Sequence, residues 1–221
     1  MNSTALVTGA SRGIGRAIAE RMRDVGMKVI SPSHEELDLL SGHSIDAYLA
    51  SLREPVDILV NNAGINRLAE STDVSDDDIG DTLQVNLVAP MRLIRGIVPQ
   101  MKERRYGRIV NISSVWSVVS RQRRLVYSAS KSGLNGLTRA LAVELAAYNV
   151  LVNAVAPGYV ATEMTRQNNT EEELEIIRKT IPLQRLADPA EIAEVVLFLC
   201  SDKNTYITGQ VIVADGGFTC V

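Results

Sequence analysis

The sequence has few of the residues and patterns that mark several large classes of protein. It contains only two cysteines, Cys200 and Cys220. Their spacing suits neither a disulfide framework nor a metal site, so we expect reduced thiols in a reducing compartment. No apolar run reaches the roughly 18 residues that a membrane-spanning helix needs. We therefore expect a protein without a disulfide framework, a cysteine metal site or a transmembrane segment.

An excess of positive charge is also missing. The net charge is −3 and the pI about 5.5, which gives no indication of binding to nucleic acid or to an anionic membrane. The stretch "TALVTGAS" starts at Thr4, too early for a charged leader with a cleavage site. These absences predict a cytoplasmic protein. Apolar residues make up 46% and charged residues 22% of 221 residues, as suits a single domain spanning residues 1–221.

Short apolar runs rich in β-branched residues alternate with helical patterns along the chain. Runs such as "RIVNI" and "VLVNAV" are almost continuously apolar, as is typical of parallel strands covered by helices on both faces. The predicted strands are Ala5–Thr8, Lys28–Ile30, Asp57–Asn61, Arg108–Ser113, Val150–Ala156 and Gln210–Ala214. The alternation predicts an α/β fold with a doubly wound sheet.

Four helices can be predicted with their starting signals. Ser41 is a candidate cap for a helix with apolar residues at helical spacing, and Pro189 lies near the first turn of a late helix. Two longer helices are expected over about 76–103 and 127–148. The polar segment 165–180 lies between a strand and the last helix, and we interpret it as part of a mobile substrate lid at about 159–187.

A glycine-rich loop follows the first predicted strand. In "LVTGASRGIGRAIAE", Gly9, Gly13 and Gly15 give the pattern G-x3-G-x-G, and a helix begins near Ile14. Glycines allow a tight turn and close approach of backbone N–H groups to a pyrophosphate. The helix N-terminus adds free N–H donors and a positive dipole end. The context of strand, loop and helix predicts a dinucleotide site.

Four motifs in order resemble the short-chain dehydrogenase/reductase family. They are "TGASRGIG", "NNAG" at 61–64, "YSASK" at 127–131 and "APG" at 156–158. Longer stretches such as "YITGQVIVADGG" resemble the 3-oxoacyl-[acyl-carrier-protein] reductase type. The resemblance implies a single Rossmann-type domain with a mainly parallel, seven-stranded sheet. The alternative is a sheet reduced around strands 2–3, because only Pro32 to Leu37 separate the second strand from Asp38.

The preferred nicotinamide cofactor depends on the end of the second strand. An acid there binds the ribose 2′-hydroxyl of NAD, whereas cations or hydroxyls admit the 2′-phosphate of NADP. Ser33 and His34 occupy this place, and Arg12 in the glycine loop is a second candidate phosphate contact. NADP(H) is therefore favoured. Glu35 keeps NAD(H) open, because a slightly longer turn would bring this acid to the ribose.

The stretch "YSASK" offers a proton donor and a cation on one helix face. Tyr127 and Lys131 are four residues apart, a spacing at which side chains can touch. A free tyrosine has a pKa of about 10, and a nearby ammonium lowers it by favouring the phenolate. The resemblance implies that Ser114 orients the substrate carbonyl and that Asn86 holds a water leading to Lys131. Ser113 is expected to point to the opposite side of the strand from Ser114.

The remaining site residues are implied by the resemblance alone. Asp38 and Leu39 would flank the adenine, Val160 and Thr162 would meet the carboxamide, and Lys131 would bind ribose. The implied cofactor contacts, besides those at Arg12, Ser33 and His34, are Gly9, Ser11, Gly13, Ile14, Asp38, Leu39, Asn62, Ala63, Gly64, Tyr127, Lys131, Pro157, Gly158, Val160 and Thr162.

Substrate preference is expected to depend on residues 115–126 and on the lid. Trp116 is a candidate either for stacking on the substrate or for filling the core. Arg124, with Arg121 and Arg123, forms a basic cluster suited to an acidic carrier protein, a phosphate or a carboxylate. A solvated charge run or a subunit contact is the alternative interpretation of this cluster.

Three functions remain open from the sequence. The first is an NADPH-dependent reductase of ketones on a small-molecule or carrier-linked substrate, such as a 3-oxoacyl thioester. The second is an NAD(P)-dependent alcohol, sugar or nucleotide-sugar dehydrogenase. The third is a regulator that binds the cofactor without turnover, which the intact Ser114, Tyr127 and Lys131 argue against. The resemblance also implies a homotetramer or homodimer that pairs through the long helices and the last strand.

Overall fold

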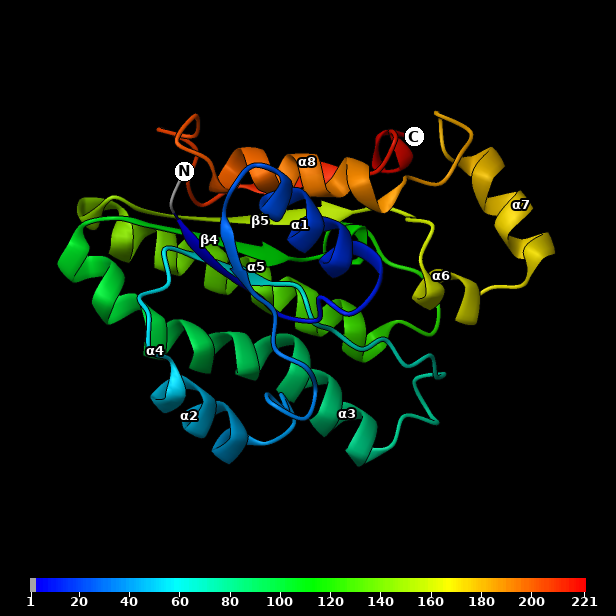
Figure 1. Ribbon diagram of the computed structural model, residues 1–221. Coiled ribbons are helices and arrows are strands. Elements are labelled where there is room, and N and C mark those ends of the chain that lie inside the picture. Colours follow the sequence, from blue (N-terminus) through cyan, green and yellow to red (C-terminus); the bar gives the residue numbers. More distant parts are fainter. Residues whose placement is uncertain (1–2) are drawn as a thin grey trace.

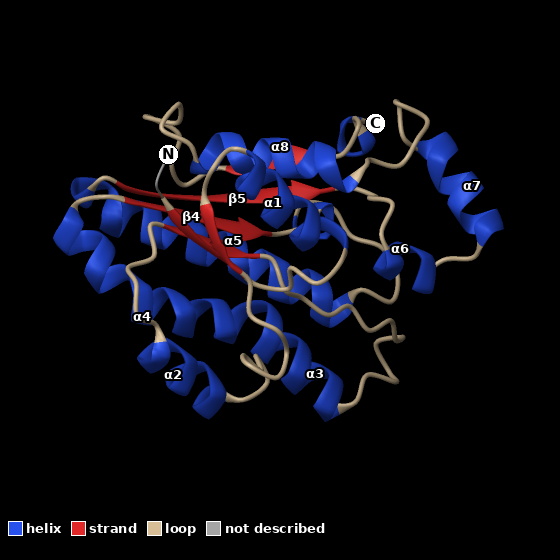
Figure 2. Ribbon diagram, in the orientation of Figure 1, coloured by secondary structure: helices blue, strands red, loops and turns tan. Residues whose placement is uncertain are grey.

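A six-stranded parallel sheet forms the centre of the computed structural model, which describes residues 3–221 (Figures 1 and 2). The strand order is β2-β1-β3-β4-β5-β6, and every neighbouring pair is parallel. The strands are β1 (Thr4–Val7), β2 (Lys28–Ile30), β3 (Ile58–Asn61), β4 (Gly107–Ile112), β5 (Val150–Pro157) and β6 (Val211–Ala214). Each end lies within one residue of its predicted position, so the predicted doubly wound α/β fold is confirmed.

Helices cover both faces of the sheet. One apolar cluster joins β1, β3 and β4 to α1 (Gly13–Asp24) and α8 (Pro189–Cys200). A second cluster joins the opposite face to α2 (Gly42–Ser51), α4 (Ala89–Arg104) and α5 (Leu125–Leu145). Figure 1 shows α8 along the top of the sheet, α1 in front of the strands, and the other three helices toward the bottom. Burial on both faces explains why the central strands are almost wholly apolar.

The helix starts follow local signals in the sequence. The Ser41 side chain accepts a hydrogen bond from Ser44 N and caps α2 as predicted. Asp188 and Glu191 form a capping box at the start of α8, where Pro189 occupies the first turn. Shorter 3-10 helices cover Val115–Ser117, Ala146–Tyr148 and Phe218–Cys220. None of the helices within residues 3–221 is long and apolar enough to cross a membrane.

The helical region expected over about 76–103 is divided into three parts. α3 (Asp76–Leu83) leads into a π-helical turn at Gln84–Val88, and α4 continues from Ala89. Asn86 lies in the middle of the π-helical turn. Such turns add a residue to the helix and are frequent at functional sites. The interruption therefore positions Asn86 differently from a residue on an unbroken helix.

The sheet is reduced at its β2 edge. Only α2 connects β2 with β3, and within residues 3–221 no strand lies beyond β2. The sheet thus has six strands, and the expected reduction around strands 2–3 accounts for the difference from seven. The physical reason is the short segment between Pro32 and Asp38, which leaves no residues for a further helix and strand.

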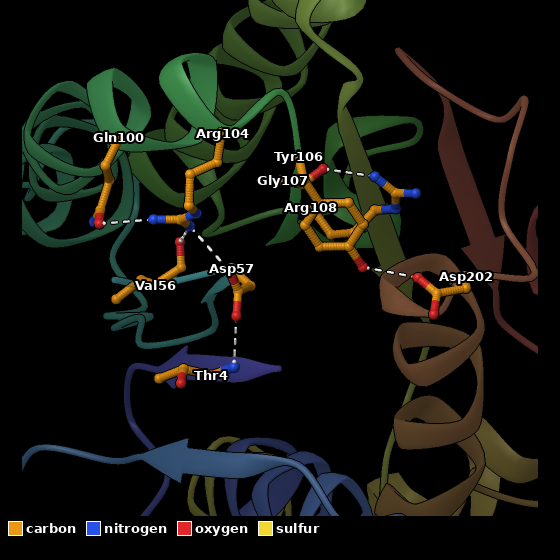
Figure 3. A network of polar contacts seen from close by, with 9 residues as sticks. All are labelled: Thr4, Val56, Asp57, Gln100, Arg104, Tyr106, Gly107, Arg108 and Asp202. Atoms are coloured by element: carbon orange, nitrogen blue, oxygen red, sulfur yellow. Dashed lines mark hydrogen bonds and ion pairs between the residues drawn. The ribbon is translucent and has the colours of Figure 1, made fainter. Parts of the chain in front are cut away.

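Polar contacts tie together the amino-terminal edge of the sheet (Figure 3). Asp57 accepts hydrogen bonds from Thr4 N at 2.9 Å and from Arg104 Nη2 at 2.9 Å. The buried Arg108 donates to the carbonyl oxygens of Gly107, at 2.9 Å, and Asn149, at 3.2 Å. These contacts provide hydrogen-bond partners for backbone groups at this edge of the sheet. The opposite, carboxyl-terminal edge carries the candidate site.

Two short helices extend beyond the carboxyl-terminal edge, where Figure 1 shows them at the right of the molecule. They are α6 (Glu163–Gln167) and α7 (Glu171–Thr180). Thr170 and Glu173 form a capping box that starts α7. The predicted lid is therefore largely helical. Its apolar side packs on a cluster that contains Trp116 and Tyr159.

Candidate active site

A cleft of ≈ 640 Å³ opens at the carboxyl ends of the parallel strands. In the sheet, β2 and β3 lie on opposite sides of β1, so the direction of strand order reverses at β1. The cleft lies at this switch point, which is where ligands bind in doubly wound sheets. Almost all the predicted site residues line it: Gly9, Ser11, Arg12, Gly13, Ile14, Ser33, His34, Asp38, Leu39, Asn62, Ala63, Gly64, Ser114, Trp116, Arg124, Tyr127, Lys131, Pro157, Gly158, Val160 and Thr162. Asn86 is buried behind this surface.

The glycine loop leaves the start of α1 free to bind an anion. No side chain caps α1, and its first turn contains no acidic residue. Gly9 has φ +66°, and a Cβ on Gly15 would lie 2.2 Å from the Gly9 carbonyl oxygen. Neither position therefore tolerates a side chain without a change in the loop. The free N–H groups and the close backbone approach fit the pyrophosphate of a dinucleotide.

Thr8 and Asn62 hold the glycine loop in place. Thr8 Oγ1 accepts hydrogen bonds from the backbone N–H groups of Asn62 and Ala63, both at 3.1 Å. Asn62 Nδ2 donates to the carbonyl oxygens of Thr8, at 2.9 Å, and Gly9, at 3.1 Å. Thr8 was not predicted as a site residue from the sequence. The sequence pattern that could have indicated this role is a polar β-branched residue between an apolar strand and the first glycine of the loop.

The end of β2 presents Ser33 and His34 to the cleft, but not Glu35 or Glu36. Glu36 instead accepts a hydrogen bond from Ser33 N at 2.7 Å, and this bond is the main cause of the lowered pKa of its carboxyl group. His34 Nδ1 lies 4.0 Å from Asp38 Oδ1. The acids that favoured NAD in the sequence therefore lie outside the cleft lining. Arg12 reaches the cleft from the glycine loop, where it pairs with Glu163 of α6.

Tyr127 and Lys131 lie one turn apart on α5, as their spacing predicted. Lys131 is buried and its Nζ donates to the Ile112 carbonyl oxygen at 2.7 Å. The same Nζ is 5.7 Å from the centre of the Tyr127 ring. Burial lowers the pKa of Lys131 to about 8. Burial also raises the pKa of Tyr127, while the nearby Ser114 hydroxyl and the charge of Arg124 act in the opposite direction.

The two serines at the end of β4 have different environments. Ser114 interacts with the Tyr127 phenol, and its Oγ accepts a hydrogen bond from Trp116 N at 3.2 Å. Ser113 Oγ contacts Ser117 Oγ at 3.1 Å and donates to the Lys131 carbonyl oxygen at 3.4 Å. Ser113 therefore packs against the backbone of α5, whereas Ser114 is the hydroxyl beside the phenol.

Asn86 connects the π-helical turn to the loop after β3. Its Oδ1 accepts from Ile65 N at 2.9 Å, and its Nδ2 donates to the Ile65 carbonyl at 2.9 Å and to Ser130 Oγ at 3.1 Å. A Cβ on Gly64 would lie 3.2 Å from Asn86 Oδ1 and 3.4 Å from Lys131 Nζ. Both groups of the Asn86 amide are thus engaged within the protein, and Lys131 Nζ lies close by across Gly64.

Trp116 belongs to an aromatic cluster under the lid. It makes edge-to-face contacts with Tyr159, at 5.8 Å between ring centres, and with Phe218, at 5.9 Å. Leu174 and Ile177 of α7 pack on the same cluster. Trp116 therefore fills an apolar core and also lines the cleft. Tyr159 and the lid residues Met164, Asn168 and Asn169 also line the cleft and were not predicted as site residues from the sequence.

Arg124 is the member of the basic cluster that reaches the cleft. It is buried at the start of α5, and its guanidinium carbon lies 5.5 Å from the centre of the Trp116 ring. Arg121 and Arg123 do not line the cleft. Arg121 donates to Tyr159 Oη at 2.9 Å, and Arg123 lies 3.8 Å from Glu70. The three arginines of the sequence cluster therefore have three different environments.

Comparison with known proteins agrees with this geometry. Residues 35–219 match the family described as enoyl-(acyl carrier protein) reductase. The chain is 43% identical to the 3-oxoacyl-[acyl-carrier-protein] reductase FabG of Aquifex aeolicus, over 96% of this chain and 95% of that protein. It is 40% identical to the oxidoreductase UcpA of Escherichia coli O157:H7, over 98% of this chain and 94% of that protein.

Solved structures show the same similarity in three dimensions. A 4-hydroxyisoleucine dehydrogenase complexed with NADH superposes with a TM-score of 0.95 and 30% identity, over 100% of both chains. A second structure is that of a Beutenbergia cavernae protein assigned as an NAD(P)-dependent gluconate 5-dehydrogenase, with bound NADP at low occupancy. It superposes with a TM-score of 0.89 and 36% identity, over 99% of this chain and 97% of that one. Together with the cleft, these similarities show that the chain belongs to the short-chain dehydrogenase/reductase family and is an NAD(P)-dependent oxidoreductase.

Proposed function

We propose that this protein reduces a ketone to a secondary alcohol and prefers NADPH as the hydride donor. The observation that carries the proposal is the juxtaposition of Tyr127, Ser114 and Lys131 in a cleft whose other end is the uncapped start of α1. A phenol, a hydroxyl and a buried ammonium form a group suited to proton transfer at a carbonyl oxygen. The glycine loop suits the nucleotide that must accompany it.

A nicotinamide held in the cleft would supply the hydride for the carbonyl carbon. The Tyr127 phenol donates its proton to the carbonyl oxygen, which the Ser114 hydroxyl orients. The Lys131 ammonium stabilises the phenolate that remains, and its pKa of about 8 keeps it mostly charged at pH 7. Lys131 uses one of its three N–H donors on Ile112, which leaves two for ribose hydroxyls and water.

The preference for NADPH is supported by the end of β2. Ser33 and His34 line the cleft there, and Arg12 faces it from the glycine loop. Glu35 and Glu36 do not line the cleft, so no acid of this pair is placed to bind the 2′-hydroxyl. NAD(H) remains the alternative cofactor, and relative rates with the two nucleotides decide between them.

Two substrate classes have specific support. The similarity to 3-oxoacyl-[acyl-carrier-protein] reductases favours a 3-oxoacyl thioester, free or carrier-linked. The similarity to a 4-hydroxyisoleucine dehydrogenase and to a gluconate 5-dehydrogenase favours a second candidate, a ketone or alcohol that also carries a carboxylate. In that second case, the physiological direction can be oxidation of the alcohol.

We further propose that the chain forms a single domain, in which the segment at about 159–187 covers the bound substrate. We also propose that copies of the chain assemble into a homotetramer or homodimer. The lid is supported by Met164, Asn168 and Asn169, which line the cleft from α6 and the turn after it. Assembly through the long helices and the last strand is supported by exposed apolar residues. Val143 on α5 is 85% exposed and Val213 on the edge strand β6 is 37% exposed.

The function is tested by nucleotide oxidation with a panel of ketones. NADPH and NADH would each be supplied with 3-oxoacyl thioesters, oxo acids, keto sugars and simple ketones, and the rate followed by absorbance. We expect turnover of at least one class, with NADPH faster than NADH. Nucleotide binding without turnover of any ketone or alcohol would instead indicate a regulator that binds the cofactor.

A further inference from the structure

A buried arginine lacks a carboxylate partner at the substrate end of the cleft. Arg124 is 5% exposed, and no ion pair or side-chain hydrogen bond joins it to any of residues 3–221. The side chain lines the cleft, so the guanidinium faces the space where a ligand would bind instead of a carboxylate of the protein. The Trp116 ring, 5.5 Å from the guanidinium carbon, stabilises the cation but supplies no hydrogen-bond acceptor. A partner for Arg124 is therefore missing from the protein itself.

The other cations along the cleft are already engaged. Arg12 pairs with Glu163, and Arg67 pairs with Asp78 at 2.8 Å and Asp81 at 2.9 Å. Lys131 donates to a backbone carbonyl within the catalytic group. Within the described residues, Arg124 is thus the cation of this end of the cleft that has no partner. One fixed positive charge suits a ligand group that carries one negative charge.

The position of Arg124 relative to Tyr127 restricts where that negative charge can be. Arg124 is the residue just before α5 and Tyr127 is the third residue of that helix, and both side chains line the cleft. The charge of Arg124 also acts on the Tyr127 phenol, so a small ligand with its carbonyl oxygen at the phenol lies near the guanidinium. A planar guanidinium also matches a carboxylate in a bidentate geometry.

On these grounds, and resting on the reductase function proposed above, we propose that the substrate is a short oxo acid whose carboxylate binds Arg124. The carboxylate lies one to three carbons from the ketone. Hydride and proton addition leave it unchanged, so the product is the corresponding hydroxy acid. A 3-oxoacyl thioester has no charge at this place, because the thioester replaces the carboxylate. Arg124 therefore favours the free acid over the carrier-linked substrate.

The test compares substrates that differ only in this charge. The initial rate of NADPH oxidation gives kcat/KM for 3-oxobutanoate and its methyl ester, and for 4-oxopentanoate and its methyl ester. We expect the wild type to prefer at least one acid over its ester by roughly ten- to a hundredfold, the size of a charge-assisted hydrogen bond. Arg124→Gln should abolish that preference, and Arg124→Lys should retain part of it.

The ratio of acid to ester separates binding of the carboxylate from an effect on Tyr127. Loss of the Arg124 charge changes the electrostatics of the phenol for both substrates equally, so that effect cancels in the ratio and appears as a shifted pH profile. Arg123→Gln is the matched control, because Arg123 lies outside the cleft lining, and its ratio should equal that of the wild type.

A second readout does not depend on turnover. Trp116 is the one tryptophan of the chain and lies under Arg124, so its fluorescence should respond to an anion at the guanidinium. Titration of the nucleotide-free protein with 3-hydroxybutanoate should give a saturable change that its methyl ester and Arg124→Gln do not give. Circular dichroism and a melting curve would check that the variant is folded.

Each outcome has a defined meaning. Equal kcat/KM for acids and esters, together with equal fluorescence titrations, would overturn the proposal while leaving the reductase function intact. A strong preference for a phosphorylated hydroxyketone over every oxo acid would also overturn it and would assign Arg124 to phosphate. If no ketone is reduced at all, the reductase function fails, and the fluorescence titration still decides whether Arg124 binds a carboxylate.

Discussion

Lys131 Nζ donates a hydrogen bond to the Ile112 carbonyl oxygen at 2.7 Å, at the end of the strand that precedes Ser113 and Ser114. This bond ties the helix that carries the proposed acid to the strand that carries the proposed carbonyl-orienting hydroxyl. The ammonium is buried, so its orientation is determined by the protein before any ligand binds. Preorganisation of this kind favours charge stabilisation in the reaction.

Removing the phenolic hydroxyl of Tyr127 should remove most of the reductase activity. General acid catalysis contributes roughly 10²–10⁴-fold to rates, and we expect Tyr127→Phe to lose activity in that range while NADPH binding persists. Tyr106→Phe is the matched control, because its hydroxyl donates to Asp202 at the opposite edge of the sheet (Figure 3). Full activity of Tyr127→Phe would show that the mechanism is wrong.

The two neighbouring serines provide an internal comparison. Ser114→Ala should lower kcat by about 10²-fold, because the carbonyl oxygen loses a hydrogen-bond donor in the transition state. Ser113→Ala should leave kcat within a fewfold of wild type, since its hydroxyl packs on Ser117 and the α5 backbone. Steady-state kinetics with one ketone measure both variants. If the larger loss came from Ser113→Ala, the assignment of Ser114 would be reversed.

The lowered pKa of Lys131 predicts how stability depends on pH. Because its pKa falls from 10.5 to about 8 on folding, the unfolded chain binds more protons than the folded one between these values. The free energy of unfolding should therefore rise with pH across this window, by at most about 3 kcal/mol for this group. Below pH 8 its contribution is constant and unfavourable.

Urea unfolding of the nucleotide-free protein at pH 7.5 and pH 10 tests this prediction. Lys131→Met lacks the titrating group, so the advantage of the variant over wild type should shrink as the pH rises. Groups that titrate equally in both proteins cancel in the difference. A difference that does not change with pH would mean that the Lys131 pKa is not depressed.

The NADPH preference predicts the effect of an acid at the end of β2. Ser33→Asp should shift the ratio of kcat/KM toward NADH by roughly ten- to a hundredfold, because a carboxylate repels the 2′-phosphate and accepts from a ribose hydroxyl. Arg12→Ala should weaken NADPH more than NADH. Glu35→Gln is the matched control and should leave the ratio unchanged, since Glu35 does not line the cleft. A wild-type enzyme that strongly prefers NADH would contradict the cofactor assignment.

Removal of the Asn86 amide should destabilise the protein. Asn86 is 1% exposed and satisfies both the N–H and the carbonyl of Ile65. Each buried polar group left without a partner costs about 1–3 kcal/mol, so Asn86→Ala should lower the free energy of unfolding by a few kcal/mol. Chemical denaturation measures the loss. An unchanged midpoint would mean that water replaces the amide without cost.

The fold was predictable because its strands are marked by uninterrupted apolar runs. Burial on both faces leaves such runs few alternatives, so β4 and β5 begin and end within a residue of their predicted limits. The π-helical turn at Gln84–Val88 was not predictable from periodicity. It adds one residue to a helix whose neighbours on either side keep ordinary helical spacing, and tertiary contacts of Asn86 stabilise it.

The site was predictable where spacing on one element fixes geometry, as for Tyr127 and Lys131. It was less predictable where partners come from distant parts of the chain. Arg121, Arg123 and Arg124 look alike in the sequence, and only the packing of Tyr159, Glu70 and Trp116 against them gives each a separate environment. Likewise, Glu35 and Glu36 could be judged only after the turn that follows β2 was known.

The order of strands in the sheet also bears on how the protein forms during synthesis. Each of β4, β5 and β6 lies on the outer side of the strands that precede it in the chain, so the sheet can grow in the order of synthesis. Each new strand finds its partner already at the growing edge, so no later strand has to insert between two earlier ones. The sheet can therefore be extended as the chain is synthesised, whereas α1 gains its apolar cover only after α8 has been made.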